Sequence, residues 1–224
     1  IAERIDANLL DVTMEDLHDM PQQLYDGKIK KLREKTQGQL IIKEYPTASA
    51  HSGHFKSLIN ELALKKSFRP DVIFIDYLNI CASSRFKGGN ISSYFYVKAI
   101  AEELRGLAVE FNVPIFSATQ TTRTGFVSTD IGLEDTSESF GLPATADFMF
   151  ALMSNEELEQ LGQMKVKQLK NRYNDPSVNR AFIIGVDRAK MRLYDVQQKA
   201  GEIVDANQVD EKEDAYNKFS DFKL

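Results

Sequence analysis

The 224-residue chain has little of what disulfide-rich or metal-dependent domains need, and cysteine is the scarcest. Its single cysteine, Cys81, excludes an internal disulfide framework and a zinc site built from several cysteines, and it fits a reducing, cytoplasmic setting. The three histidines, His18, His51 and His54, are too few and too scattered to predict a metal centre. No apolar run approaches the ~20 residues of a membrane span, and no signal-peptide pattern opens the chain.

An excess of basic residues is missing as well. The chain carries 28 Lys and Arg against 33 Asp and Glu, a net charge of −5, which argues against a generally basic nucleic-acid-binding coat. Residues 201–224 hold seven acidic residues and three lysines, so they contribute −4, and residues 1–200 are nearly neutral. We expect one domain over residues 1–200, followed by a flexible acidic tail that cannot offset its ordering entropy. A partner-binding tail is the alternative.

Alternating strand and helix patterns predict an open α/β sheet for the body of the chain. Residues 72–75 form a continuous β-branched and aromatic run, of the kind that is buried on both faces of a parallel sheet. Apolar residues then recur at helical spacing over residues 97–111, and residues 115–118 read as the next strand. Another buried strand is expected at residues 148–152.

Three further patterns predict local structure. The apolar run at residues 40–42 is a candidate strand, and Ser154 with Glu157 has the spacing of a helix capping box. Residues 181–186 and 191–196 predict a terminal hairpin or neighbouring strands.

Chemistry in such sheets collects at the carboxyl ends of the strands, so the polar residues that follow each strand are the candidates. Asp76 directly follows the first strand, where an acid in a P-loop ATPase helps to hold Mg²⁺ directly or through water; a capping role is the alternative. Gln120 follows the second strand and can hydrogen-bond a γ-phosphate, an attacking water or only the loop backbone. Lys170 and Arg172 lie two positions apart on an extended segment, and they either clamp an anion or form a solvated edge.

The order of these motifs resembles the C-terminal ATPase domain of DnaB-family replicative helicases, in particular the version found in T-even-type bacteriophages. The resemblance is carried by segments 71–78, 97–108 and 141–149, Gln120 with Arg123, Glu138-Ser139 with Asp147, and Lys170 with Arg172. It covers roughly residues 1–195. It implies a RecA-like P-loop NTPase core, with a mainly parallel β-sheet flanked by helices, that assembles as a ring of six.

The resemblance also implies a role for each candidate. Asp76 would be the Mg²⁺-coordinating acid, and Gln120 would sense the γ-phosphate of ATP and couple it to DNA-binding loops. Arg172 would be the arginine finger with Lys170 as its companion, both acting on the ATP of the adjacent subunit. The family has Gln between these two cations, whereas this chain has the shorter Asn171.

DNA contacts are implied for two loops that line the channel of the ring. The second loop falls at residues 123–141, where the candidate contacts are Arg123 and a phosphate-gripping turn of Ser137, Glu138, Ser139 and Phe140. Many relatives carry Arg in place of Ser137. The first loop, residues 85–90, is basic and glycine-rich, with Arg85 and Lys87 as candidate contacts; an ordinary surface loop is the alternative.

The family's phosphate-binding loop, G-x-x-x-x-G-K-[ST], occurs nowhere in the 224 residues. Gly27-Lys28 is the only Gly–Lys dipeptide, and no glycine lies five residues before it. Because the chain also starts at Ile1, we expect a fragment whose P-loop lies upstream, with negligible ATP hydrolysis on its own.

The activity implied by the resemblance is ATP-driven unwinding of duplex DNA by a homohexamer that translocates on single-stranded DNA. ATP and Mg²⁺ are the implied cofactors. Primase and a helicase loader are candidate partners, the expected location is the cytoplasm of a bacterial host, and no membrane is involved. The alternatives are a RecA-like ATPase or recombinase without unwinding, and a non-catalytic interaction module.

Overall fold

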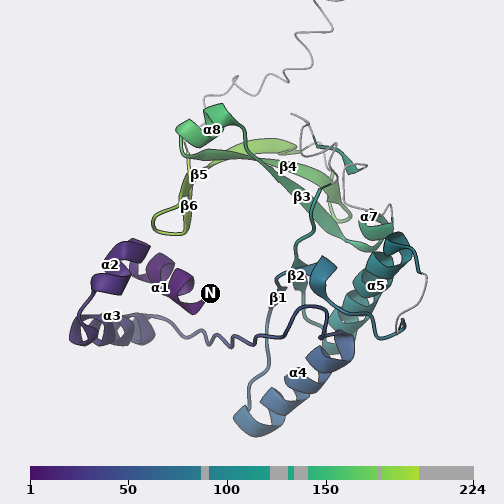
Figure 1. The fold of residues 1–224 in the computed structure, drawn as a ribbon, viewed down its shortest axis with the longest axis horizontal. Coiled ribbons are helices and arrows are strands. Elements are labelled where there is room, and N and C mark those ends of the chain that lie inside the picture. The colour runs from purple at the N-terminus through teal and green to yellow at the C-terminus, as the bar shows by residue number, and fades with distance from the viewer. Residues whose placement is uncertain (87–90, 122–130, 134–140, 176–177, 197–224) are drawn as a thin grey trace, which may run out of the picture.

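The computed structural model describes residues 1–86, 91–121, 131–133, 141–175 and 178–196, and Figure 1 shows how they are arranged. Three N-terminal helices are joined by an extended segment to helix α4 (Ser52–Lys66). These helices are α1 (Ala2–Leu10), α2 (Met14–Asp19) and α3 (Gln22–Lys35). The segment includes residues 40–42, so the strand expected there is absent; Leu40 is 61% exposed and has no sheet to join in the described chain.

The middle of the chain forms a parallel β–α–β unit. Strand β1 (Ile73–Ile75) leads through the 3-10 helix η1 (Leu78–Ile80) and helix α5 (Ser93–Phe111) to strand β2 (Ile115–Ser117). The two strands pair in parallel, with Ile73 opposite Ile115. The strand–helix–strand order predicted for this region is therefore confirmed.

The last described part of the chain forms an antiparallel sheet of order β3-β4-β5-β6. Short helix α7 (Gly141–Thr145) precedes β3, and α8 (Glu156–Gln160) joins β3 to β4. The strands are β3 (Phe148–Met153), β4 (Gln163–Asn171), β5 (Ala181–Asp187) and β6 (Arg192–Asp195). The terminal hairpin is confirmed as β5 and β6. The cap of α8 is Asn155, not Ser154: the Asn155 Oδ1 atom accepts from the Leu158 N–H at 2.8 Å.

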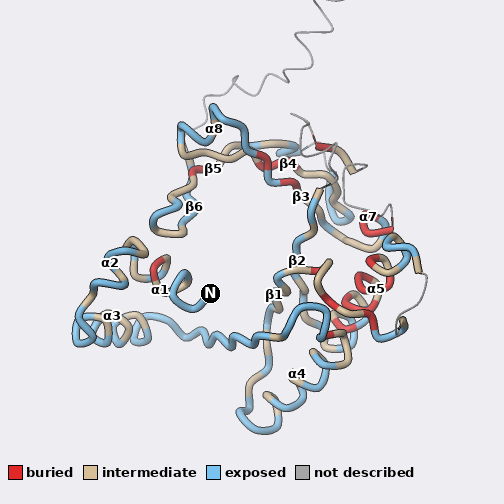
Figure 2. The backbone as a smooth tube through the Cα atoms, in the orientation of Figure 1, coloured by how far each residue is buried: buried red, intermediate tan, exposed pale blue. Residues whose placement is uncertain are grey.

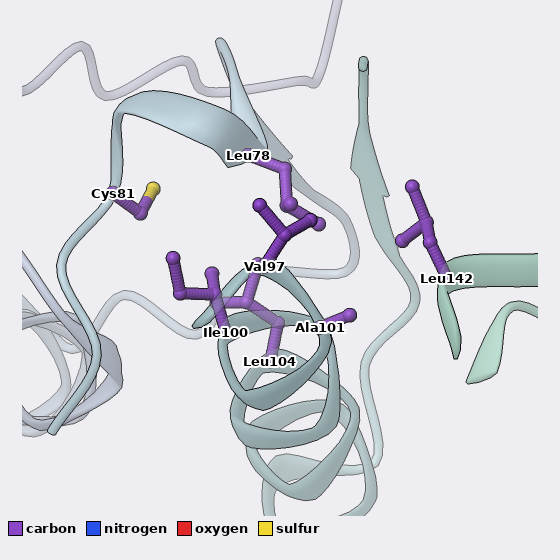
Figure 3. Close-up of a cluster of buried hydrophobic side chains, with 7 residues drawn as sticks. All are labelled: Leu78, Cys81, Val97, Ile100, Ala101, Leu104 and Leu142. Atoms are coloured by element: carbon purple, nitrogen blue, oxygen red, sulfur yellow. The ribbon is translucent and has the colours of Figure 1, made fainter. Parts of the chain in front are cut away.

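Helix α5 carries the main hydrophobic core, as its burial in Figure 2 shows. Its Val97, Ile100, Ala101 and Leu104 side chains meet Leu78, Cys81 and Leu142 in one cluster (Figure 3). The cluster joins η1, α5 and α7, so it fixes the carboxyl end of β1 relative to the segment that leads into β3. Burial also raises the pKa of the Cys81 thiol.

Strands β1 and β3 are only half-buried, whereas the sequence predicts buried strands at these positions. In β1, Ile75 packs on the α5 cluster, but Phe74 on the opposite face stacks on Phe116 at 5.3 Å between ring centroids and is 73% exposed. In β3, Ala151 is buried while Phe150 is 48% exposed. A run of large apolar residues predicts a strand, but the number of covered faces depends on what packs against the sheet.

The N-terminal helices contact the turn between β5 and β6. The Asn8 amide donates to the Met191 carbonyl at 2.7 Å, and the Asp11 carboxylate pairs with Lys190 at 3.2 Å and Arg192 at 3.1 Å. The hydrogen bond and charge of Lys190, aided by Arg192, hold the pKa of Asp11 below its usual value. These contacts join the two ends of the described chain. No helix in the described part combines the length and apolar character that a bilayer span requires.

The core assignment predicts different responses at two positions of α5. Ile100 is 1% exposed and Val109 is 73% exposed. We expect Ile100→Val to lower the free energy of unfolding by about 1 kcal/mol, because it leaves a small cavity in the cluster. Val109→Ala, which also shortens an aliphatic side chain, is the control and should change it by less than about 0.5 kcal/mol. Urea titrations followed by circular dichroism measure both, and equal losses would contradict this core.

Candidate nucleotide site

Two of the candidate residues lie at the carboxyl ends of neighbouring parallel strands. Asp76 directly follows β1, and Gln120 lies three residues after the end of β2. The Gln120 Nε2 atom donates to the Tyr77 hydroxyl at 3.3 Å, which places the amide beside the residue that follows Asp76. The structure therefore brings Asp76 and Gln120 to one edge of the β1–β2 pair.

Hydrogen bonds between the two strand ends hold this edge together. The Thr119 hydroxyl donates to the Asn79 side chain at 2.8 Å, and the Ser117 hydroxyl donates to the Ile75 carbonyl at 2.8 Å. The Leu78 N–H also bonds the Ala118 carbonyl at 3.1 Å.

The Asp76 side chain has the chemistry of a divalent-cation ligand. Asp76 is exposed, and within the described residues no hydrogen bond or ion pair engages its carboxylate. Carboxylate and water oxygens are the ligands that Mg²⁺ prefers. The residue fits the role of an Mg²⁺ ligand, directly or through water, at the end of a parallel strand.

Lys170 and Arg172 lie on the same side of the end of β4, as their spacing predicts. The Lys170 ammonium donates to the carbonyls of Pro143 and Ala144, and Arg172 Nη2 donates to the Ala144 carbonyl at 3.3 Å. Desolvation, followed by the positive charge of Arg172, lowers the pKa of Lys170. Both cations are therefore held at the C-terminal end of helix α7, where backbone carbonyls lack helical partners.

Asn171, between the two cations, closes the turn that follows β4. Its Oδ1 atom accepts from the backbone N–H groups of Tyr173 at 3.0 Å and Asn174 at 3.1 Å. Its Nδ2 atom donates to Gln168. The short side chain thus has a local structural role next to Arg172.

Asp147 joins Arg172 to helix α5. Its Oδ1 atom lies 2.6 Å from Arg172 Nη1, and its Oδ2 atom lies 2.8 Å from Arg105 Nη1. Arg105 also donates to the Thr145 carbonyl at 2.6 Å. Two arginines from distant parts of the chain therefore share one carboxylate beside α7.

A second polar cluster anchors the segment that leads into residues 85–90. The Glu103 carboxylate of α5, 9% exposed, accepts hydrogen bonds from the hydroxyls of Ser52, Ser83 and Ser84. It also accepts from the Ser84 N–H at 2.9 Å. Burial alone would raise its pKa, but these hydrogen bonds lower the pKa of Glu103 to about 2.

Of the candidate DNA contacts, only Arg85 lies within the described residues. Its guanidinium pairs with Glu102 at 2.6 Å, and 51% of its side chain is exposed. The remaining candidates lie outside the described residues: Lys87, Arg123, Ser137, Glu138, Ser139 and Phe140. The acidic tail, residues 201–224, also lies outside them.

Sequence patterns alone assign no role to Glu103, Arg105 or Asp147. Glu103 and Arg105 fall outside the apolar stripe of α5 and read as solvated. Asp147 is among the residues on which the family resemblance depends, but its position in the sequence predicts no role for its side chain. The one available hint was the Ser83-Ser84 pair, two hydroxyls that can serve a nearby carboxylate.

Comparisons with known proteins give the context of this site. No family model matches the chain. It is 42% identical over 225 residues to the DnaB-like replicative helicase of Enterobacteria phage T4, which covers 97% of this chain and 47% of that protein. It is 35% identical over 128 residues, 55% of this chain and 26% of the relative, to a probable plasmid replicative DNA helicase of Chlamydia trachomatis. The chain spans about half the length, or less, of these relatives.

Solved structures show the fold. A structure solved as an ATPase domain aligns with a TM-score of 0.69 and 16% identity, over 87% of this chain and 69% of that one. A DnaB-like replicative helicase, from a study of its interactions with primase, aligns with a TM-score of 0.67 and 16% identity, over 87% of this chain and 47% of that one. The chain is therefore a homologue of the DnaB-like replicative helicase of phage T4, and it has the RecA-like fold of these solved ATPase domains.

Proposed function

We propose that this chain is the distal part of the motor domain of a hexameric replicative DNA helicase. The proposed activity is ATP-driven unwinding of duplex DNA by a ring that translocates on single-stranded DNA. The observation that carries the proposal is the 42% identity to the phage T4 helicase over 97% of this chain. The shared edge of Asp76 and Gln120 supports it, because ligands of open α/β sheets bind at the carboxyl ends of the strands.

In the proposed site each residue has a distinct task. Asp76 holds Mg²⁺, which when bound offsets the negative charge of the ATP phosphates. Gln120 senses the γ-phosphate by hydrogen bonding to it. The hydrogen bond from Gln120 to Tyr77 couples the position of this side chain to the end of β1. Arg172, with Lys170 beside it, stabilises charge that develops on the phosphate of the neighbouring subunit.

The proposed partners follow from the same function. Single-stranded DNA passes residues 85–90 and 123–141 in the channel of a homohexamer, where a few basic residues suffice because the channel concentrates them. Primase and a helicase loader are the proposed protein partners. The proposed setting is the host cytoplasm, where phage DNA is replicated.

Unwinding of a forked duplex tests the proposal. We expect the full-length protein that contains this chain to separate a forked duplex when ATP and Mg²⁺ are supplied. DNA-dependent hydrolysis without strand separation would instead indicate a RecA-like ATPase or recombinase. Absence of both hydrolysis and nucleotide binding would indicate a non-catalytic interaction module.

The Mg²⁺ role of Asp76 has its own test. We expect Asp76→Asn to raise the Mg²⁺ concentration for half-maximal hydrolysis about tenfold, because the amide keeps the shape and loses the charge. Asp71→Asn, at another exposed acid, before the same strand, is the matched control and should leave the Mg²⁺ titration unchanged. A wild-type titration curve for Asp76→Asn contradicts the assignment.

A further inference from the structure

We propose that Asp147 is a positioning residue that holds the Arg172 guanidinium back on its own subunit, and that Arg105 allows its release. The inference rests on the proposed role of Arg172 as an arginine finger. It adds a regulatory step to that site, because the guanidinium must leave Asp147 before it can reach a phosphate on a neighbouring subunit.

The first support is the way in which the two arginines share one carboxylate. Arg172 Nη1 lies 2.6 Å from Oδ1 of Asp147, whereas Arg105 Nη1 lies 2.8 Å from Oδ2. Each arginine therefore uses its own oxygen. When Arg172 leaves, Asp147 keeps its pair with Arg105, so no uncompensated charge remains on the partly buried carboxylate.

The second support is that only the Arg172 side chain has to move. The Arg172 backbone N–H donates to the Asp147 carbonyl at 2.9 Å, and this bond is independent of the guanidinium. Arg105 is fixed to α7 through the Thr145 carbonyl at 2.6 Å. The backbone at the end of β4 and the Arg105–Asp147 pair can therefore stay in place while the Arg172 guanidinium moves.

The exposure of the three side chains sets the strength of this restraint. The side chains of Arg172, Arg105 and Asp147 are 45%, 39% and 31% exposed. An ion pair of such exposure shifts an equilibrium by roughly two- to fivefold. A restraint of this strength tunes the fraction of released Arg172 without locking it.

Substitutions of Asp147 and Arg105 in the full-length ATPase test the proposal, because they should act in opposite directions. We expect Asp147→Asn to raise kcat at saturating ATP about threefold with KM unchanged, since Arg172 is released more often. Arg105→Ala should lower kcat about threefold, because Arg172 is then the one remaining ion-pair partner of Asp147 among the described residues and is held more tightly. The double variant should match Asp147→Asn, since Arg105 acts only through Asp147.

Charge-conserving variants separate this role from a merely structural one. Arg105→Lys should restore the kcat lost in Arg105→Ala, and thermal melts should show equal folding of all variants compared. If Asp147→Asn does not fold, the comparison of Arg105→Ala with Arg105→Lys decides alone. An Asp147→Asn kcat at or below wild type, or an unchanged kcat in Arg105→Ala, would overturn the proposal.

Failure of this inference is distinguishable from failure of the proposed function. If Arg172→Ala hydrolyses ATP normally, the finger assignment itself is wrong. If Arg172→Ala is inactive while Asp147→Asn is no faster than wild type, the finger assignment stands and the restraint by Asp147 is rejected.

Discussion

Arg172→Ala in the full-length protein is expected to lower the kcat of ATP hydrolysis by about a thousandfold or more while nucleotide binding is retained. The physical reason is that an arginine finger stabilises charge that develops only in the transition state. Its loss therefore affects kcat and leaves the ground-state complex largely intact. Steady-state hydrolysis and equilibrium binding of a fluorescent ATP analogue measure the two quantities separately.

A matched control and a mixing experiment sharpen this prediction. Arg188→Ala removes an arginine that pairs only with exposed Glu159, at 3.3 Å, among the described contacts, and should leave hydrolysis unchanged. Mixing Arg172→Ala protein with Asp76→Ala protein should recover part of the activity. At a hybrid interface, one subunit supplies Asp76 with the nucleotide and its neighbour supplies Arg172. Normal turnover by Arg172→Ala alone contradicts the role of Arg172, and absence of recovery contradicts its action between subunits.

Glu103→Gln is expected to lower the free energy of unfolding by about 2–3 kcal/mol near neutral pH. The carboxylate accepts hydrogen bonds from three serine hydroxyls and from backbone N–H groups, and it is 9% exposed. An amide presents one acceptor atom where the carboxylate presents two, so buried donors lose their partners. The segment that leads to residues 85–90 should loosen as a result.

The pH dependence of this effect has a defined sign. The pKa of Glu103 falls from 4.5 to about 2 in the folded protein, so the unfolded state binds more protons between these values. The stabilisation is therefore fully present above about pH 4.5 and is lost as pH falls toward about 2. The difference in stability between wild type and Glu103→Gln should shrink over that window.

Urea unfolding followed by circular dichroism at about pH 7 and about pH 3 measures both effects. The matched control is Glu102→Gln, one position earlier on α5, where the carboxylate is 37% exposed and pairs with Arg85. We expect this change to lower the free energy of unfolding by less than about 1 kcal/mol, because exposed ion pairs contribute little to stability. Equal losses at the two positions, or a pH-independent loss at Glu103, would contradict the anchoring role.

Local patterns were sufficient for much of the fold. The apolar spacing of residues 97–111 predicts α5, because a helix must repeat its buried face every three to four residues. The runs at 72–75 and 115–118 predict β1 and β2, and their parallel pairing follows from the helix between them. Residues 40–42 show the limit: three apolar residues have the composition of a strand but find no partner strand in the described chain.

The candidate site also has a part that the sequence predicts and a part that it does not. Asp76 and Gln120 are predictable from their positions after strands, and the structure places them at one edge. The contacts of Arg172 with Asp147 and Ala144 are not predictable, since Ala144 belongs to α7 and Asp147 is the residue just before β3. Arg105 reads as an ordinary charged residue on the polar face of a helix until α7 is packed against it.

The sequence by itself determined the strand–helix–strand order of β1, α5 and β2, the polar residues at the strand ends and the resemblance to replicative helicases. All of these depend on residues close together in the chain or on motifs in a fixed order. Only the tertiary structure decided which polar groups meet: Arg105 and Arg172 pair with Asp147, and three serine hydroxyls donate to Glu103. Hydrogen bonds and ion pairs depend on distances of about 3 Å, and packing rather than sequence spacing sets those distances.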